Sequence, residues 1–127
     1  MHRASLLDIA DINRWGGADF TEFMANPMNV FLAEGEGGAL FAWRGPGIYE
    51  VHVCFEQRGK EVLALAHRML AYMRENYGAR MFWSVIPPQS RKVIMFARLM
   101  GWKSRGVAEF AHGVCEIFVE ENPCRQS

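Results

Sequence analysis

The chain has 127 residues, of which half are hydrophobic and 13% aromatic, and this profile predicts one compact domain over residues 1–122 followed by a polar tail at 123–127. Its 14 basic residues balance 14 acidic ones, which argues against a nucleic-acid-binding protein, because such proteins usually carry an excess of lysine and arginine. No apolar run approaches the roughly 18 residues that a membrane helix needs, and the first 17 residues carry Asp8, Asp11 and Arg14 where a signal peptide would be apolar. We therefore expect a cytoplasmic protein without a membrane partner.

The periodicity of apolar residues divides the chain into helices and short strands. Two short helices open the chain, and runs rich in Val, Phe and Tyr then alternate with glycine-rich turns, which is typical of an antiparallel meander. A long helix, a buried strand, a second amphipathic helix and a closing hairpin follow. In chain order, helices are predicted at residues 5–12, 18–25, 59–77 and 90–100, and strands at 29–33, 39–43, 48–55, 81–86, 107–110 and 114–119. For residues 102–106 both an extended and an irregular conformation fit the sequence. The last turn is predicted at His112 and Gly113.

Several local signals support the helices. Ser5 can cap the first helix together with Asp8 in a capping-box pattern, with Leu6, Ile9 and Ala10 at helical spacing behind it. Gly78 stands where a glycine commonly ends a helix. The apolar side of the long helix is predicted to consist of Val62, Leu65, Ala66, Met69, Leu70 and Met73, and that of the following helix of Val93, Ile94, Phe96, Ala97 and Leu99.

This order of elements predicts an α+β fold with a mixed sheet. The meander is antiparallel, whereas a strand, helix and strand in succession form a crossover that makes two strands parallel. We therefore expect a mostly antiparallel sheet with one parallel pair near its centre, flanked by helices.

Cysteine and histidine spacing argues against a metal centre. The three cysteines include no CxxC pair, and the four histidines form neither an HxH nor an HExxH arrangement. We expect reduced thiols and no bound metal.

The turn between the third strand and the long helix is a candidate anion site. Gly59 stands in this turn, and the first amides of a helix have no partner within the helix. A phosphate bound there would accept their hydrogen bonds and gain from the helix dipole. An ordinary strand-to-helix turn, tightened by a glycine, is the alternative.

The segment from residue 48 to 102 resembles the GCN5-related N-acetyltransferase (GNAT) family. In that family a strand ends in V-x-P-x-x-R/Q-x-x-G-x-G/A and leads into the helix that holds acetyl-coenzyme A. Val53 matches the first position and Arg58 the R/Q, while Phe55 replaces the proline. Glu61 and Leu63 stand at the last two positions of the motif, where the family has glycine or alanine.

A second landmark of the family is N-x-x-A followed by a Gly-Phe pair. Residues 90–93 and the pair Gly101 and Trp102 fit its spacing. The family usually has a tyrosine four residues before that glycine, which protonates the leaving thiolate, and Ala97 occupies this position. Return of a proton to coenzyme A would then need water or another side chain.

The resemblance implies the GNAT fold and an acetyl-coenzyme A-dependent N-acetyltransferase. The amine acceptor would be a small molecule or a protein, and a homodimer is left open. The implied cofactor-binding residues are Val53, Cys54 and Phe55 through their backbone, Arg58, Gly59, Lys60, Glu61, Val62 and Leu63 at the pyrophosphate, and Ser90 and Arg91 on the neighbouring helix.

Direct transfer requires a base that takes a proton from the amine. Glu50 and His52 are the candidates, because they lie on one face of the strand at 48–55, with Tyr49 and Val51 on the other. An imidazole ordinarily titrates near pH 6.5, whereas a carboxylate would need a pKa raised by burial. Two polar residues on the outward face of a half-buried strand are the alternative. Cys54 is not expected to act as a nucleophile, since free cysteine is usually buried.

A second, looser resemblance concerns proteins encoded by tailed bacteriophages and prophages. The segments 49–53, 58–61 and 86–87 are similar to small acetyltransferase-like phage proteins, some of which are virion proteins. An inactive structural protein with the GNAT fold is therefore the alternative to an enzyme, and a regulatory module that binds coenzyme A is a third reading.

Overall fold

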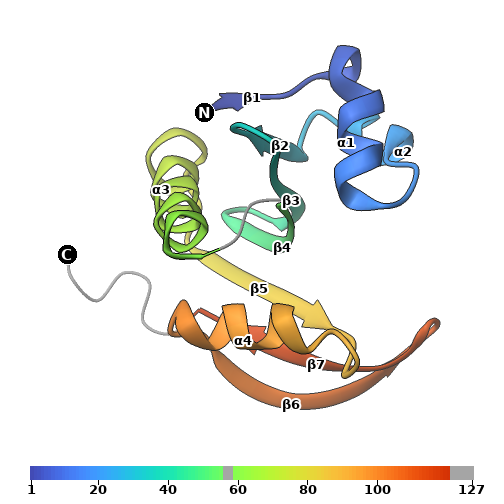
Figure 1. Ribbon diagram of the computed structural model, residues 1–127, viewed down its shortest axis with the longest axis vertical. Helices are drawn as coiled ribbons and strands as arrows, with labels where there is room; N and C mark the ends of the chain where they lie inside the picture. The colour runs from blue at the N-terminus through green and yellow to red at the C-terminus, as the bar shows by residue number, and fades with distance from the viewer. Residues whose placement is uncertain (56–58, 121–127) are drawn as a thin grey trace.

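The computed structural model describes residues 1–55 and 59–120, in which seven strands form one sheet with the order β1-β2-β3-β4-β5-β7-β6 (Figure 1). The elements in chain order are β1 (His2–Arg3), the 3₁₀ turn η1 (Leu6–Asp8), α1 (Ile9–Gly16), α2 (Thr21–Ala25), β2 (Val30–Ala33), β3 (Gly37–Gly45), β4 (Ile48–Phe55), α3 (Lys60–Tyr77), β5 (Met81–Ile86), α4 (Arg91–Leu99), β6 (Lys103–Phe110) and β7 (Gly113–Val119).

The predicted mixed sheet is confirmed. Neighbouring strands pair antiparallel, except that β4 and β5 pair parallel at the centre, where α3 forms the crossover between them. The last strand, β7, lies between β5 and β6 rather than at the edge. The edge strand β6 is therefore joined to the sheet only through the hairpin partner that follows it in the chain.

The predicted boundaries of β4 and β5 are exact, and other boundaries need correction. The first predicted helix is a 3₁₀ turn followed by α1, which continues to Gly16, and residues 103–110 form one continuous strand. The closing hairpin turns at residues 111–112, one residue earlier than predicted. β1 was not predicted, because two residues are too short to show a period.

Two clusters of buried side chains lie on opposite faces of the sheet. Alternate residues of β2 and β3 belong to different clusters, as expected where both faces of a strand are covered. One cluster lies under α3 and includes Ala97 of α4, and the other includes Ile12 of α1, with side chains of α2 packed against it. The sheet is therefore covered on both sides around β2, β3 and β4.

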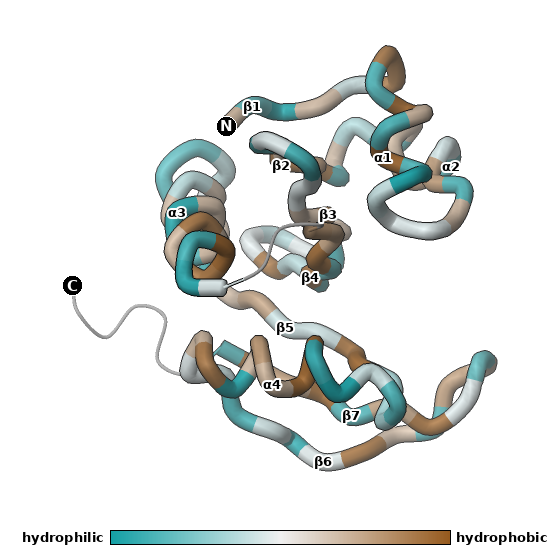
Figure 2. Tube along the Cα trace, viewed as in Figure 1, coloured by the Kyte–Doolittle hydropathy of each residue, from teal (hydrophilic) through white to brown (hydrophobic). Residues whose placement is uncertain are grey.

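The long helix α3 buries the six apolar side chains predicted for it. Met69 and Met73 are almost completely buried, and Gly78 ends the helix in the left-handed conformation. Burying a side chain of this size contributes roughly 1.5–3 kcal/mol, so the stripe anchors α3 to the sheet. In Figure 2, teal and brown alternate along α3, as expected for a helix with one apolar side.

The apolar sides predicted for the other helices are only partly buried. The capping box of Ser5 and Asp8 is confirmed, but the Leu6 side chain behind it is exposed, and Ile12 is the buried residue of α1. In α4 only Ala97 is fully buried, whereas Leu99 is 63% exposed. These helices are short, and one narrow stripe of each reaches the core.

No helix within residues 1–55 and 59–120 is long and apolar enough to cross a membrane. Residues 121–127, which include the predicted tail, lie outside the described part of the chain.

Candidate active site

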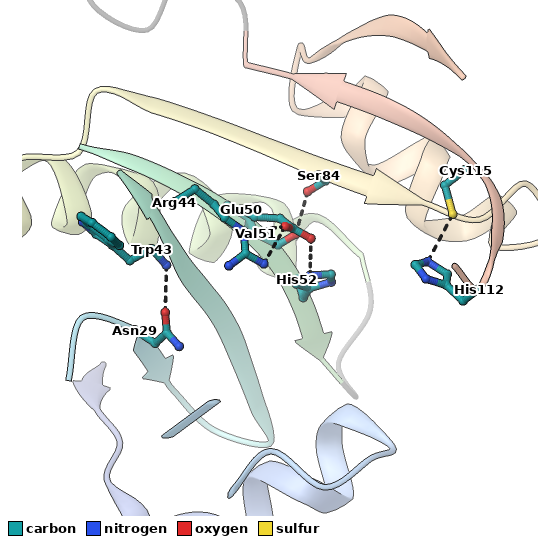
Figure 3. A network of polar contacts seen from close by, with 9 residues as sticks. All are labelled: Asn29, Trp43, Arg44, Glu50, Val51, His52, Ser84, His112 and Cys115. Carbon is teal, nitrogen blue, oxygen red and sulfur yellow. Dashed lines mark hydrogen bonds and ion pairs between the residues drawn. The ribbon is translucent and has the colours of Figure 1, made fainter. Parts of the chain in front are cut away.

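The parallel strands β4 and β5 separate after only three paired residues. Glu50 and Trp83 are the last pair, and at the next position the hydroxyl of Ser84 donates a hydrogen bond of 2.7 Å to the carbonyl oxygen of Val51. A side chain thus occupies the place of the next backbone bond. Beyond this point the two strands diverge, and the sheet opens between them (Figure 3).

A cavity of about 180 Å³ lies at this opening. Its lining is mostly apolar, and it comes from β4, β5, α3 and α4. The residues that bear on function are Val51, His52 and Val53 of β4, Ser84 of β5, and Ser90 and Ala97 at α4. The cavity brings together three residues that the sequence analysis selected separately, namely His52, Val53 and Ser90.

The backbone of Val53 faces this opening. The carbonyl of Val51 points toward β5, and residues two apart in a strand present their peptide groups to the same neighbour. Val53 therefore presents its N–H and C=O groups toward β5, where the ladder has already ended. Buried peptide groups need partners, so this position suits a ligand that carries amide groups of its own.

The next two residues of the predicted site have side chains elsewhere. Cys54 is 8% exposed and belongs to the cluster on the α1 face, and burial raises the pKa of its thiol to about 11. Phe55 packs against the cluster under α3. Both can offer only their backbone to a ligand in the opening, which is the role predicted for them.

The predicted pyrophosphate site lies at the start of α3. Gly59 precedes the helix with φ +93°, a conformation that favours glycine, and Lys60 and Glu61 are exposed in the first turn. Val62 points into the core, and Leu63 is half-buried. Arg58 lies outside the described residues.

Glu61 also lines a second hollow, of about 380 Å³, between α3 and the turn from β2 to β3. Glu34 and Arg68 line the same hollow and are joined by an ion pair of 3.2 Å. This hollow has a charged rim, and of the predicted site residues that the structure describes, Glu61 and Val62 line it.

Ser90 and Arg91 begin α4. Ser90 is the N-cap residue, yet its hydroxyl makes no capping hydrogen bond, and the residue lines the cavity. Arg91 is exposed at the first position of the helix. Of the two, Ser90 is the one whose side chain can reach a ligand in the opening.

Glu50 and His52 lie side by side on the face of β4 opposite Tyr49 and Val51, as predicted. Nε2 of His52 is 2.9 Å from Oε2 of Glu50, and the guanidinium of Arg44 binds Oε1 of the same carboxylate (Figure 3). The hydrogen bond from His52 holds the pKa of Glu50 below its ordinary value, although burial opposes this shift. The raised pKa that Glu50 would need as a base is therefore not found.

Sequence analysis missed Arg44 and Ser84. Ser84 is a single hydroxyl in the apolar run of β5, which is a usable signal, because a buried hydroxyl needs a partner. Arg44 and Glu50 flank a glycine-rich turn, and opposite charges in that position are also a usable signal. Figure 3 further shows His112 beside Cys115 in the β6–β7 hairpin, with Nε2 and Sγ 3.5 Å apart. The described residues contain no group of three or more His, Cys, Asp or Glu side chains that could hold a metal ion.

Comparison with known proteins gives matches at the level of structure. Neither the known protein-family models nor the curated protein sequences give a match. Among solved structures, the aminoglycoside acetyltransferase AAC(6')-Ib in complex with coenzyme A and kanamycin matches with a TM-score of 0.73 at 13% identity, over 99% of this chain and 96% of the other. The chain has the GNAT fold.

Two further structures agree with this fold. An acetyltransferase of the GNAT family from Bacillus anthracis matches with a TM-score of 0.61 at 14% identity, over 93% of this chain and 90% of the other. A variant of the spermidine N-acetyltransferase SpeG from Vibrio cholerae matches with a TM-score of 0.63 at 8% identity, over 79% and 69%. The expected GNAT fold is confirmed, whereas these matches lend no support to the resemblance to phage proteins.

Proposed function

We propose that this protein is an acetyl-coenzyme A-dependent N-acetyltransferase, in which an amine attacks the thioester directly. The opening between β4 and β5 is the observation that carries the proposal. It combines backbone groups beyond the end of the β4–β5 ladder, a cavity and a candidate histidine base within one short stretch of β4.

The pantetheine arm of coenzyme A is an extended chain with two amide groups, and such a chain suits the opening. The peptide groups of Val53 would bind these amides as a neighbouring strand does. The hydroxyl of Ser90, which makes no capping bond, would bind the arm from α4. The apolar side chains of α3 and α4 that line the cavity would surround the rest of the arm.

The start of α3 would hold the pyrophosphate. Amides from residues 59–63 offer hydrogen bonds, and the positive end of the helix dipole favours an anion there. Lys60 adds a positive charge in the first turn, while Glu61 adds a negative one. Arg58 and Arg91 remain predicted contacts of the cofactor phosphates.

His52 would serve as the base. The amine nitrogen forms a bond to the thioester carbon as the carbon–sulfur bond breaks, and the proton released from nitrogen passes to the imidazole. The contact with His52 holds the pKa of Glu50 below its ordinary value, and the ionised Glu50 carboxylate would stabilise the imidazolium that forms. The thiolate that leaves must gain a proton from water or another donor, because Ala97 offers none.

The acceptor is expected to be an amine on a small molecule or a protein. The matched structures include proteins named for the acetylation of aminoglycosides and of spermidine, which supports an amine in general. A cytoplasmic location and a homodimer remain predictions.

Ligand-dependent thermal unfolding tests the cofactor. Millimolar acetyl-coenzyme A should raise the unfolding temperature of the wild-type protein, because a ligand that binds only the folded state stabilises it. Ala97→Leu fills the cavity and should abolish this rise, whereas Ala10→Leu, the same change on an exposed position of α1, should retain it. If Ala97→Leu does not fold, Ser90→Arg at the rim of the cavity replaces it. No rise in the wild type would reject the proposal.

Release of free thiol with a panel of amines then separates an enzyme from an inactive relative. Ala97 is the observation that favours an inactive protein with this fold, since it removes the proton donor usual in the family. Binding of acetyl-coenzyme A without thiol release from any amine would support that second reading.

A further inference from the structure

Three charged or polar side chains form a chain of contacts across the β3–β4 hairpin. Arg44 approaches Oε1 of Glu50 with two nitrogens, Nε at 3.0 Å and Nη2 at 2.9 Å. The other carboxylate oxygen, Oε2, lies 2.9 Å from Nε2 of His52. Each oxygen of Glu50 thus has a different partner, and the carboxylate is only 12% exposed between them (Figure 3).

A β-bulge brings Arg44 to this position. Trp43 pairs with Tyr49, but the next pair is Gly45 with Ile48, so β3 contains one more residue than β4 over this interval. Arg44 is the additional residue. A bulge of this kind re-aims a side chain, and here the side chain lies over Glu50 rather than over a residue of the turn.

The hydrogen-bond chemistry of the carboxylate fixes the state of the imidazole. An ionised carboxylate can only accept hydrogen bonds, so Nε2 of His52 must be the donor in this contact. In a neutral imidazole the other nitrogen, Nδ1, then carries the lone pair. Arg44 is permanently charged, and together with His52 it keeps the pKa of Glu50 low, so that the acceptor stays ionised.

We propose that Arg44 is a positioning residue of this site: it holds the Glu50 carboxylate against Nε2 of His52, which leaves Nδ1 as the atom that takes the proton from the acceptor amine. The N–H bond of the amine breaks as the Nδ1–H bond forms, and the imidazolium is stabilised by the carboxylate at its other nitrogen. The contacts of Glu50 with Arg44 and with His52 do not depend on the reaction, whereas the role of Nδ1 rests on the proposed function.

Two of the ionisable side chains described on this face are Cys54 of β4 and Arg14 of α1. The thiol of Cys54, next along the strand, is neutral at physiological pH because burial raises its pKa. On α1, which covers this face, Arg14 binds Asp11 at 2.8 Å and Glu36 at 3.7 Å. Of the charges described on β3, β4 and α1, that of Arg44 is the one in contact with Glu50 beside the imidazole.

A purely structural role for Arg44 has different consequences. Its side chain is 48% exposed, and exposed ion pairs contribute little to stability. If Arg44 served only to hold the hairpin, its loss would lower stability slightly and leave the titration of His52 unchanged.

The test is an NMR titration of the histidine side chains in the full chain, with the His52 signal assigned by its absence in His52→Gln. Arg44→Gln removes a positive charge, so the midpoint of the His52 titration should move up by roughly half a pH unit or more. Glu50→Gln should move it down, and Arg44→Lys, which keeps the charge, should restore it toward wild type. Arg105→Gln, an exposed arginine in the bulge of β6, is the matched control and should have no effect.

The pH dependence of the acetyl-transfer rate gives a second readout. Its acidic limb should move in the same direction as the NMR midpoint in each variant. An unchanged His52 midpoint in Arg44→Gln would overturn the inference. Shifted midpoints in a protein that neither binds acetyl-coenzyme A nor releases thiol would support the positioning by Arg44 and reject the proposed function, so the two failures are distinguishable.

Discussion

The hydroxyl of Ser84 donates a hydrogen bond to the carbonyl of Val51 at the point where the two parallel strands part. This bond closes the ladder of β4 and β5 and satisfies a buried carbonyl that would otherwise face the cavity. Ser84→Ala should therefore cost about 1–3 kcal/mol, measured by urea unfolding. Ser90→Ala is the control, because that hydroxyl makes no capping bond, and its effect should stay within about 0.5 kcal/mol. Equal losses in both variants would contradict this assignment.

The contact between β2 and β3 requires a glycine. A Cβ atom on Gly38 would lie 2.2 Å from the backbone oxygen of Leu32 and 2.5 Å from the ring of Phe31. Gly38→Ala should lower the free energy of unfolding by about 3 kcal/mol or more, at the upper end for overpacked sites, because a paired strand cannot move aside. Gly17→Ala meets no atom within 4 Å and tests the cost of a positive φ alone. A smaller loss for Gly38→Ala than for Gly17→Ala would show that the strands adjust.

Loss of the base should affect the rate rather than cofactor binding. His52→Ala should lower kcat by roughly 10²–10⁴-fold, as expected for the loss of general base catalysis, with the affinity for acetyl-coenzyme A little changed. His67→Ala, on the exposed side of α3, is the matched control. Unchanged turnover in both His52→Ala and Glu50→Ala would reject the assignment of the base.

The stability conferred by Glu50 should depend on pH. Because the folded state lowers the pKa of this carboxyl below its ordinary value of 4.5, its contribution is fully present above that pH and is lost as the pH falls through the folded pKa. The difference in unfolding free energy between wild type and Glu50→Gln should be largest near neutral pH and shrink in acid. Glu22→Gln, an exposed carboxylate on α2, is the control. A difference that stays constant down to pH 3 would contradict the assignment.

Cys54 should be unreactive in the native protein. Burial raises the pKa of its thiol to about 11, so almost no thiolate exists at pH 8, and the side chain is 8% exposed. Treatment with iodoacetamide followed by mass spectrometry of the Cys54 peptide should find it unmodified until urea is added. Rapid modification of the folded protein would instead point to a reactive thiol.

The central helices and strands were predictable because the spacing of apolar residues within each one is enough to identify it. The apolar stripe of α3 and the alternation in β4, which sets Glu50 and His52 on one face and Tyr49 on the other, need no knowledge of the rest of the chain. The start of the chain was less predictable. Leu6 and Ala10 follow a helical period, yet a 3₁₀ turn at Leu6–Asp8 rotates α1 so that Ile12 points inward instead.

The missed part of the site depends on contacts between strands. Arg44 meets Glu50 only because a bulge shifts the register of β3 against β4, and no residue pattern within either strand encodes that shift. The low pKa of Glu50 follows from the same contacts. The cavity likewise depends on how far β5 diverges from β4, which is set by the packing of α3 and α4.

The three-residue ladder between β4 and β5 also divides the sheet into two units. On one side β1 to β4 form an antiparallel unit from residues 1–55, and on the other β5, β7 and β6 form a second unit from residues 81–119. Each unit is continuous in sequence, and residues 56–80, which include α3, connect them. The strand pairing that joins the two units is thus limited to three residue pairs and the bond between Ser84 and Val51, while the apolar cluster under α3 packs across both units. Backbone amides beside this short ladder should exchange with solvent deuterium sooner than those inside either unit. A ligand that binds both β4 and β5 should slow that exchange.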